Sequence, residues 1–297
     1  MNSRAFAILA LFTVQLLYGL NYTFAKVVIN ENYVKPFALV ILRVFGATVL
    51  FWLFSFWFPK EKIERKDYFK FFIASIFGVA INMILFLKGL ELTTPIHAAS
   101  IVTITPVLIL ILSAFILKEK VTKLKIIGVA LAFSGALTLT LFGESTREGD
   151  NIILGNTFIF MNAISYSIYI ILIKQLTEKY HPFTFIKWLF LFGCFMVLPF
   201  GYNELQEIQL DTFTPYIYFS VAFVVIGATF GTYILNPFAL SKLKASTVGV
   251  FIYLQPVIAG LFATLMGADV IDGLKVLAMV LIFSGVYLVS LKPKTTT

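Results

Sequence analysis

The sequence predicts an all-α membrane protein in which ten transmembrane helices form two inverted five-helix repeats. Three observations carry this prediction: the composition, the number of long apolar runs and an internal repeat. Hydrophobic residues make up 60% of the chain and charged residues 13%, and the mean hydropathy is +0.94. Soluble domains contain roughly 45–50% apolar and about 25% charged residues. A globular core cannot bury such an excess of apolar surface, so lipid must cover it.

Apolar runs of about 20 residues can cross a bilayer as helices, and this chain contains ten of them. The first run contains Gln15, Asn21 and Lys26 and shows no cleavage site of small residues, so we interpret it as a retained helix and not as a signal peptide. The ten predicted spans are residues 5–28, 36–58, 69–88, 95–117, 124–142, 152–173, 183–202, 214–238, 245–267 and 273–291.

The internal repeat divides the chain into two related halves. Residues 89–140 and 239–290 align without a gap, 150 positions apart, and Pro106 falls on Pro256. Five helices bring a chain to the far side of the membrane, so the second half must enter it inverted, as in transporters built from inverted repeats. The predicted repeats are residues 1–146 and 147–297.

The basic residues are distributed unevenly among the predicted loops. With an inside N-terminus, sixteen of the 23 Lys and Arg residues fall in inside segments and four in outside segments. Positive residues mark the cytoplasmic side of a membrane protein. The distribution predicts a multi-pass protein of the plasma (inner) membrane with both termini in the cytoplasm. The net charge of +8 then reflects topology and contact with anionic lipid, and we expect no nucleic-acid partner.

Residues suited to metal binding or catalysis are scarce. The chain has one cysteine, Cys194, and two histidines, so we expect neither an intrachain disulfide nor a protein metal site. The sequence contains no HExxH or GxSxG motif and no glycine-rich phosphate loop. We therefore expect no catalytic residues, no cofactor and no enzymatic activity.

Five segments resemble the EamA-type ten-helix proteins of the drug/metabolite transporter superfamily. They are LLYGLNYTFAK (16–26), GLELTTPIHAASIVTITPV (89–107), LKEKVTKLKIIGVALAFSGALTL (117–139), PFALSKLKASTVGVFIYLQPV (237–257) and GLKVLAMVLIFSGVYLV (273–289). The resemblance covers nearly the whole chain. It implies a transporter of two five-helix units, with a path lined by the first, third, fourth, sixth, eighth and ninth helices.

The resemblance says less about the substrate than about the fold. Members of the superfamily carry amino acids, other metabolites, nucleobase-like compounds and toxic cations, often outward, so export is the implied direction. The family's acidic residue after the fourth helix is Glu119 here, but its second copy is Asp269 where the family usually has Glu. This departure weakens any argument that gives the two positions one role.

The predicted solute site consists of polar side chains that face inward near mid-membrane, because a polar group facing lipid is costly. Gln15, Tyr18 and Tyr22 share one face of the first predicted helix, and Tyr166 and Tyr169 share one face of the sixth. Since the two helices are related by the repeat, we predict that they form opposite walls of a central cavity. The alternative is helix packing in which these groups bond to neighbouring backbone.

The 150-residue register adds three deep polar residues, Asn82, Tyr253 and Gln255, to the predicted substrate-binding set. Pro106 and Pro256 each remove a backbone donor within a span, which permits a bend. We interpret these bends as places where the bundle flexes during transport, with static kinks as the alternative.

Three charged or titratable residues are candidates for gating. Arg43 lies seven residues into the second predicted span, about 10 Å below its outer end by helical rise. Its open roles are function or gating, a structural pair with Glu91 or a backbone carbonyl, and snorkelling to the surface. His97 and Glu91 could form a proton-responsive gating pair, with an interfacial histidine and a surface carboxylate as the alternative.

Together these features predict a secondary transporter that exports a small organic metabolite, such as an amino acid, by alternating access at the repeat interface. A passive channel or facilitator is the main alternative, and a membrane-embedded enzyme is less favoured. Because the predicted cavity has tyrosines and amides but few charges, we expect a neutral, zwitterionic or aromatic solute. The expected partners are this solute, membrane lipid and a second copy of the chain bound through the fifth and tenth helices.

Overall fold

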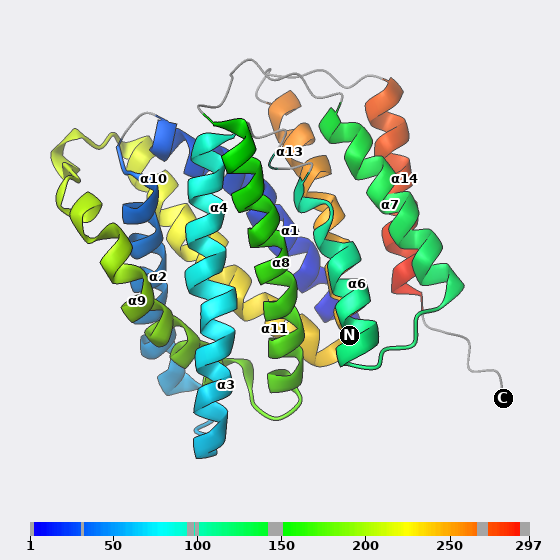
Figure 1. Ribbon diagram of the computed structural model, residues 1–297, viewed down its shortest axis with the longest axis horizontal. Helices are drawn as coiled ribbons and strands as arrows, with labels where there is room; N and C mark the ends of the chain where they lie inside the picture. The colour runs from blue at the N-terminus through cyan, green and yellow to red at the C-terminus, as the bar shows by residue number, and fades with distance from the viewer. Residues whose placement is uncertain are drawn as a thin grey trace.

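Long helices cross the molecule from one end to the other in the computed structural model (Figure 1). The structure describes residues 3–30, 33–93, 98, 101–141, 151–265 and 273–291. The α-helices are α1 (Ser3–Asn30), α2 (Pro36–Phe54), α3 (Arg65–Ser75), α4 (Ile81–Leu92), α6 (Thr105–Ile116), α7 (Lys123–Leu141), α8 (Ile152–Thr177), α9 (Pro182–Gln206), α10 (Pro215–Ala222), α11 (Thr232–Lys242), α12 (Ala245–Val250), α13 (Leu254–Leu265) and α14 (Gly273–Ser290).

Shorter helical segments of other types interrupt or extend several of these helices. Three are 3-10 turns: η1 (Ser55–Trp57), η3 (Leu210–Thr212) and η5 (Phe251–Tyr253). Two are π-helical, η2 (Ile76–Ala80) between α3 and α4 and η4 (Phe223–Gly231) between α10 and α11. The third, eighth and ninth predicted spans are therefore each a composite of two α-helices joined by a segment of different pitch.

Eight helical stretches in the described ranges are long and apolar enough to cross a membrane, which makes the chain a multi-pass membrane protein. They are Ser3–Ile29, Pro36–Trp57, Arg65–Leu92, Ile152–Thr177, Pro182–Gln206, Pro215–Lys242, Ala245–Phe262 and Gly273–Ser290. Of the two other predicted spans, residues 95–117 contain the shorter helix α6, which has 12 residues, and residues 124–142 overlap α7, which has 19.

Both described chain ends lie at the same end of the bundle. The guanidinium of Arg4, at the start of α1, donates to the carbonyl oxygen of Ser290 at the end of α14. Lys179, between α8 and α9, pairs with Asp67 near the start of α3 at 2.5 Å. We call this the basic end, since it also carries the lysine-rich loop between α6 and α7 (lower edge of Figure 1). The other end is the far end.

Several helix contacts between the two halves have a counterpart in which the equivalent helices of the opposite halves pack together. α4 packs on α8 as α11 packs on α1, and α6 packs on α8 as α13 packs on α1. Two further contacts join equivalent helices, α2 with α9 and α7 with α14. The π-helical segments also correspond, because a shift of 150 residues places η2 within η4. The two halves therefore share local irregularities as well as sequence.

Small residues allow α7 and α14 to approach closely at one edge of the bundle (Figure 1). A Cβ atom at Gly285 would lie 2.3 Å from the carbonyl oxygen of Gly128 and 2.7 Å from the Cβ of Ala132. Close packing of this kind drives helix association in lipid, where a hydrophobic driving force is missing. Other faces of the two helices expose apolar side chains such as Ile126 and Leu277, and a homodimer through them stays a prediction.

Replacing Gly285 by alanine should push α7 and α14 apart and cost about 1–3 kcal/mol of stability, because an overpacked contact forces backbone shifts. Gly260→Ala is the matched control, since a Cβ atom there meets nothing within 4 Å. Thermal unfolding of both variants in one detergent tests this. A Gly285→Ala protein that melts at the wild-type temperature would contradict the close contact.

Candidate functional site

A cavity lies between helices of both halves and holds about 630 Å³ of unfilled space, with the space at its mouth included. Its wall combines aromatic rings, side-chain amides and one guanidinium with a few aliphatic groups, as is typical of small-molecule sites. The lining residues are Tyr18, Asn21, Tyr22, Arg43, Asn82, Met83, Phe86, Val102, Thr105, Asn162, Tyr166, Tyr233, Ile252 and Gln255.

The structure brings five of the eight predicted substrate-binding residues together in this wall. They come from α1, α4, α8 and α13, and they are Tyr18, Tyr22, Asn82, Tyr166 and Gln255. Tyr18 of α1 and Tyr166 of α8 both line the cavity. The two helices that the sequence pairs as walls therefore both contribute to its lining.

The other three predicted residues lie outside the lining. Gln15 is buried and accepts a hydrogen bond from Nε2 of Gln255 at 2.8 Å, so it positions a lining residue. Tyr169 packs against Gly78, with its ring centroid 5.7 Å from that of Tyr233. Tyr253 is fully buried. The sequence could not separate these residues from the lining residues, because spacing along a helix defines the face on which a side chain lies but not the distance from that face to the next helix.

Several lining residues were not among the predicted site residues. Asn21 and Phe86 each neighbour a predicted helix face, and Tyr233 follows the register partner of Asn82. The sequence signal that could have identified these residues is an aromatic or amide side chain next to a predicted inward-facing position. Whether such a residue lines the cavity depends on the distance between neighbouring helices, and the repeat register gives no information about that distance.

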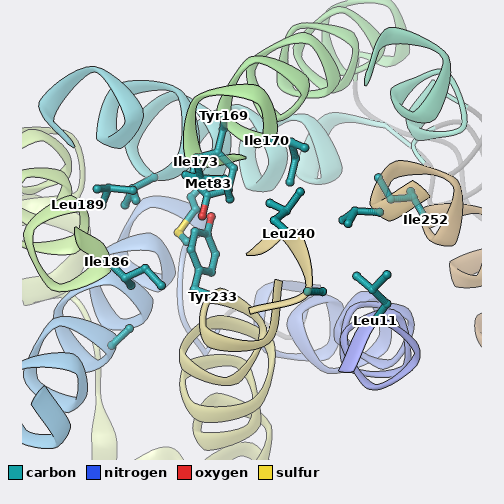
Figure 2. Close-up of a cluster of buried hydrophobic side chains, with 14 of the residues drawn as sticks. Leu11, Met83, Tyr169, Ile170, Ile173, Ile186, Leu189, Tyr233, Leu240 and Ile252 are labelled. Carbon is teal, nitrogen blue, oxygen red and sulfur yellow. The ribbon is translucent and has the colours of Figure 1, made fainter. Parts of the chain in front are cut away.

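Two polar side chains from other helices donate hydrogen bonds to backbone carbonyls of the π-helical segment η2. A π-helix changes the backbone pairing locally, and carbonyls released in this way need partners when water is absent. Oγ of Ser165 donates to the carbonyl of Phe77 at 2.7 Å, and the hydroxyl of Tyr233 donates to the carbonyl of Gly78. Figure 2 shows the hydroxyl ends of Tyr169 and Tyr233 directed toward each other beside this segment. The segment thus joins α8 and α11 to the third span.

Side-chain amides fix two other parts of the wall. Nδ2 of Asn162 donates to the backbone carbonyl of Asn82 at 2.7 Å, and Nδ2 of Asn236 donates to the hydroxyl of Tyr166 at 2.8 Å. The carbonyl oxygen of the Asn21 side chain is buried and has no hydrogen-bond partner among the described residues. The wall therefore combines fixed groups with one buried acceptor that no described residue satisfies.

Arg43 is the charged residue of the lining and is 5% exposed. Its Nε donates to Oγ1 of Thr229 at 2.9 Å, and Thr229 in turn donates to the carbonyl of Val224 in η4 at 2.7 Å. The suggested pair with Glu91 is not formed, because Glu91 pairs with Lys88 one turn away. Snorkelling is also excluded, since the guanidinium is buried at the cavity. His97 lies outside the described residues.

Four buried apolar side chains lie on the side of the cavity that faces the basic end, and we call them the apolar seal. It consists of Leu11, Ile170, Leu240 and Ile252, which are all buried and come from α1, α8, α11 and η5. Figure 2 shows these four side chains among the buried apolar groups of the bundle. On α1 the seal lies seven residues, or about 10 Å, before Tyr18 by helical rise.

A polar cluster at the basic end ties the two halves together. Glu119 accepts hydrogen bonds from the backbone N–H of Ala245 at 2.7 Å and from Oγ of Ser246 at 2.5 Å. Nζ of Lys125 lies 3.3 Å from the same carboxylate. Glu119 follows α6, whereas Ala245 and Ser246 begin α12. This Glu119 cluster thus satisfies the first N–H group of a helix in the other half.

A second apolar cluster lies toward the far end and contains Leu90, Ala98 and Ile159, with Val102 packed against it. In the 150-residue register Leu90 corresponds to Leu240 of the seal, and Val102 corresponds to Ile252. If Tyr18 is aligned with Tyr166, Ile159 corresponds to Leu11. Equivalent positions of the two halves therefore form apolar clusters on opposite sides of the cavity.

Pro106 and Pro256 each stand in the first turn of a helix, directly after an interruption. Pro106 follows a turn at residues 103–104 and lies in the first turn of α6, while Pro256 follows η5 and lies in the first turn of α13. Proline fits this position because it has no N–H to leave unsatisfied. Irregular backbone at membrane depth is tolerated where it lines a cavity, and Thr105, Ile252 and Gln255 line it here.

No metal-binding group emerges from the part of the chain that the structure describes. Three or more His, Cys, Asp or Glu side chains do not come together anywhere in these ranges. The wall is suited to hold an organic solute through rings, amides and one guanidinium.

Comparisons with known proteins agree with this architecture. The model of the EamA-like transporter family matches residues 5–141 and 153–291. An uncharacterized transporter of Bacillus subtilis, YetK, is 25% identical over 256 residues, covering 85% of this chain and 78% of its own. An uncharacterized transporter of Archaeoglobus fulgidus is 26% identical over 272 residues, covering 92% and 94%.

A solved crystal structure shows the same fold. It superposes with a TM-score of 0.74 over 95% of each chain at 17% sequence identity. The two family matches span nearly all of the residues that enclose the cavity. The chain therefore belongs to the EamA-like transporter family and is a multi-pass membrane transporter.

Proposed function

We propose that the protein is a secondary transporter that exports a small organic metabolite, such as an amino acid, by alternating access. The cavity carries the proposal, because it combines groups that can bind a solute with an apolar seal on one side. A passive channel would keep a continuous polar path, and the seal of Leu11, Ile170, Leu240 and Ile252 interrupts such a path. An enzyme is disfavoured because the described part of the lining contains no carboxylate, histidine or cysteine.

The correspondence between the two apolar clusters supports alternating access. In this proposal the halves, residues 1–146 and 147–297, are two five-helix repeats inverted relative to each other. Residues that close the basic end in one state then have counterparts that close the far end in the other state. Leu240 and Leu90 are one such pair, and Ile252 and Val102 are another.

The positive charge at the basic end supports an orientation with both termini in the cytoplasm of a cell bounded by a plasma (inner) membrane. The seal then faces the cytoplasm. Opening toward the cytoplasm requires the Glu119 cluster to separate, because Glu119 and Ala245 belong to different halves. Each turnover would break and remake these charge-assisted bonds at the membrane surface, where water can replace them.

Tyr18→Phe and Tyr166→Phe should each alter transport several-fold without impairing membrane insertion. Each change removes one hydroxyl from the wall, and a hydrogen bond contributes about 0.5–1.5 kcal/mol. The measurement is a radiolabelled substrate screen in proteoliposomes, with and without a pH gradient, followed by kinetics of the variants. Tyr287→Phe is the control, because Tyr287 is 65% exposed on α14. Unchanged kinetics in both cavity variants would show that this cavity is not the transport site.

Glu119→Gln should increase access to the seal from the basic end, because the neutral amide binds Lys125 and the start of α12 less strongly than the carboxylate. A cysteine at Ile170, in a Cys194→Ser background, would report this through its rate of labelling by a polar thiol reagent in inside-out vesicles. Glu178→Gln is the control, since this carboxylate is 65% exposed and pairs on the surface with Lys174. Equal labelling of the Glu119→Gln and control proteins would mean that the cluster does not keep the seal closed.

A further inference from the structure

We propose that Arg43 binds the carboxylate of the transported solute, and that the solute is a monocarboxylate of the amino-acid class. This inference rests on the proposed transport function and names the chemistry of its site. It begins from an imbalance of charge in the cavity wall.

Arg43 has no anionic partner among the described residues. Its one hydrogen bond goes to the neutral hydroxyl of Thr229, and the nearest described candidate, Glu91, is paired with Lys88. A guanidinium remains protonated at physiological pH, so this buried group keeps its full charge. A buried charge without a partner is costly in a membrane protein and marks a functional position. An anion that enters the cavity would offset the cost.

The backbone of η4 orients the guanidinium for such an anion. Thr229 uses its proton on the carbonyl of Val224 and accepts from Nε of Arg43, so Nε is fixed on the helix side. The terminal nitrogens of Arg43 donate no hydrogen bond within the described ranges. Two parallel N–H groups of a guanidinium match the two oxygens of a carboxylate. The remaining donors therefore have the geometry of a carboxylate clamp in a residue that lines the cavity.

The number of charges favours a carboxylate over a phosphate. Arg43 is the single cationic residue of the described lining, and that lining contains no Lys or His. A phosphate monoester carries a charge of about −1.5 to −2 at pH 7, so one guanidinium would leave it only partly neutralised. A carboxylate carries one charge, and its pair with Arg43 is neutral.

The same wall can receive the ammonium group of an amino acid. The side-chain carbonyl oxygen of Asn21 is buried, lies in the lining and has no partner among the described residues. The faces of aromatic rings also attract cations, and Tyr18 and Tyr22 stand on the same helix as Asn21. A zwitterion would thus meet a donor for its carboxylate and acceptors for its ammonium group.

Counterflow into proteoliposomes with radiolabelled L-amino acids as probes tests the inference on the wild-type protein first. For each amino acid that is transported, the competitors are its carboxamide, the amine that lacks the carboxyl group, the acid that lacks the amino group, and inorganic phosphate. We expect the carboxamide and the amine to compete at least about tenfold more weakly than the amino acid, because a charge-assisted pair is lost. The acid without the amino group should retain measurable competition.

Variants then assign the effect to one side chain. Arg43→Gln should weaken amino-acid binding by about tenfold or more, and Arg43→Lys should restore part of the loss. Lys187→Gln is the matched control, because it also removes a positive charge from a predicted span. The ammonium group of Lys187 lies over the ring of Trp52, and Lys187 is not among the residues that line the cavity. Thermal unfolding of each variant separates loss of binding from loss of fold, and the competition experiment on the wild type requires no variant.

The outcomes distinguish this inference from the proposed function. Equal competition by carboxamides or amines, unchanged affinity in folded Arg43→Gln, or a preference for phosphate would overturn the role of Arg43. Transport of cations or neutral solutes but no amino acid would overturn the inference and leave the transport function standing. If no solute of any class moves, the transport proposal fails and the inference fails with it.

Discussion

The hydrocarbon layer offers no hydrogen-bond partner, and this constraint explains most of the architecture. Helices satisfy their own backbone, and every regular element in the described ranges is a helix. The two π-helical segments receive side-chain partners. In η2 the carbonyls of Phe77 and Gly78 accept bonds from Ser165 and Tyr233. The polar side chains that a membrane protein must hide are therefore the same ones that shape a site for a solute.

The cavity lies between two apolar clusters that occupy equivalent positions of the two halves. The cluster at the basic end consists of four buried side chains from four elements. At the same end of the bundle, the Glu119 cluster joins the two halves through hydrogen bonds. Apolar contacts of this kind can separate without leaving unpaired charges, as the proposed alternating access requires. The close contact between Gly128 and Gly285 is different, because backbone atoms meet there and little movement is possible. We infer that α7 and α14 form a rigid edge while the helices around the cavity move.

Arg43 connects the fold to the chemistry of transport. Its helix packs against the π-helical segment η4, and the wider turn of that segment directs Thr229 toward Nε. A charge placed in this way adds cost to the empty protein, which supports a role in binding an anion. Aromatic rings and amides provide the remainder of the wall, so the site can discriminate by shape and by one ion pair.

The sequence by itself determined the class of the protein, the positions of most of the long helices and the family. Apolar runs and basic loops are local properties, so the predicted span at residues 152–173 agrees closely with α8 at Ile152–Thr177. The tertiary structure alone decided which polar residues line the cavity. Tyr18 and Tyr166 line it while Gln15 and Tyr169, on the same predicted faces, contact neighbouring helices. Helical periodicity gives a direction around one axis, whereas a cavity depends on the distances between several axes and on turns such as η4 that change the pitch.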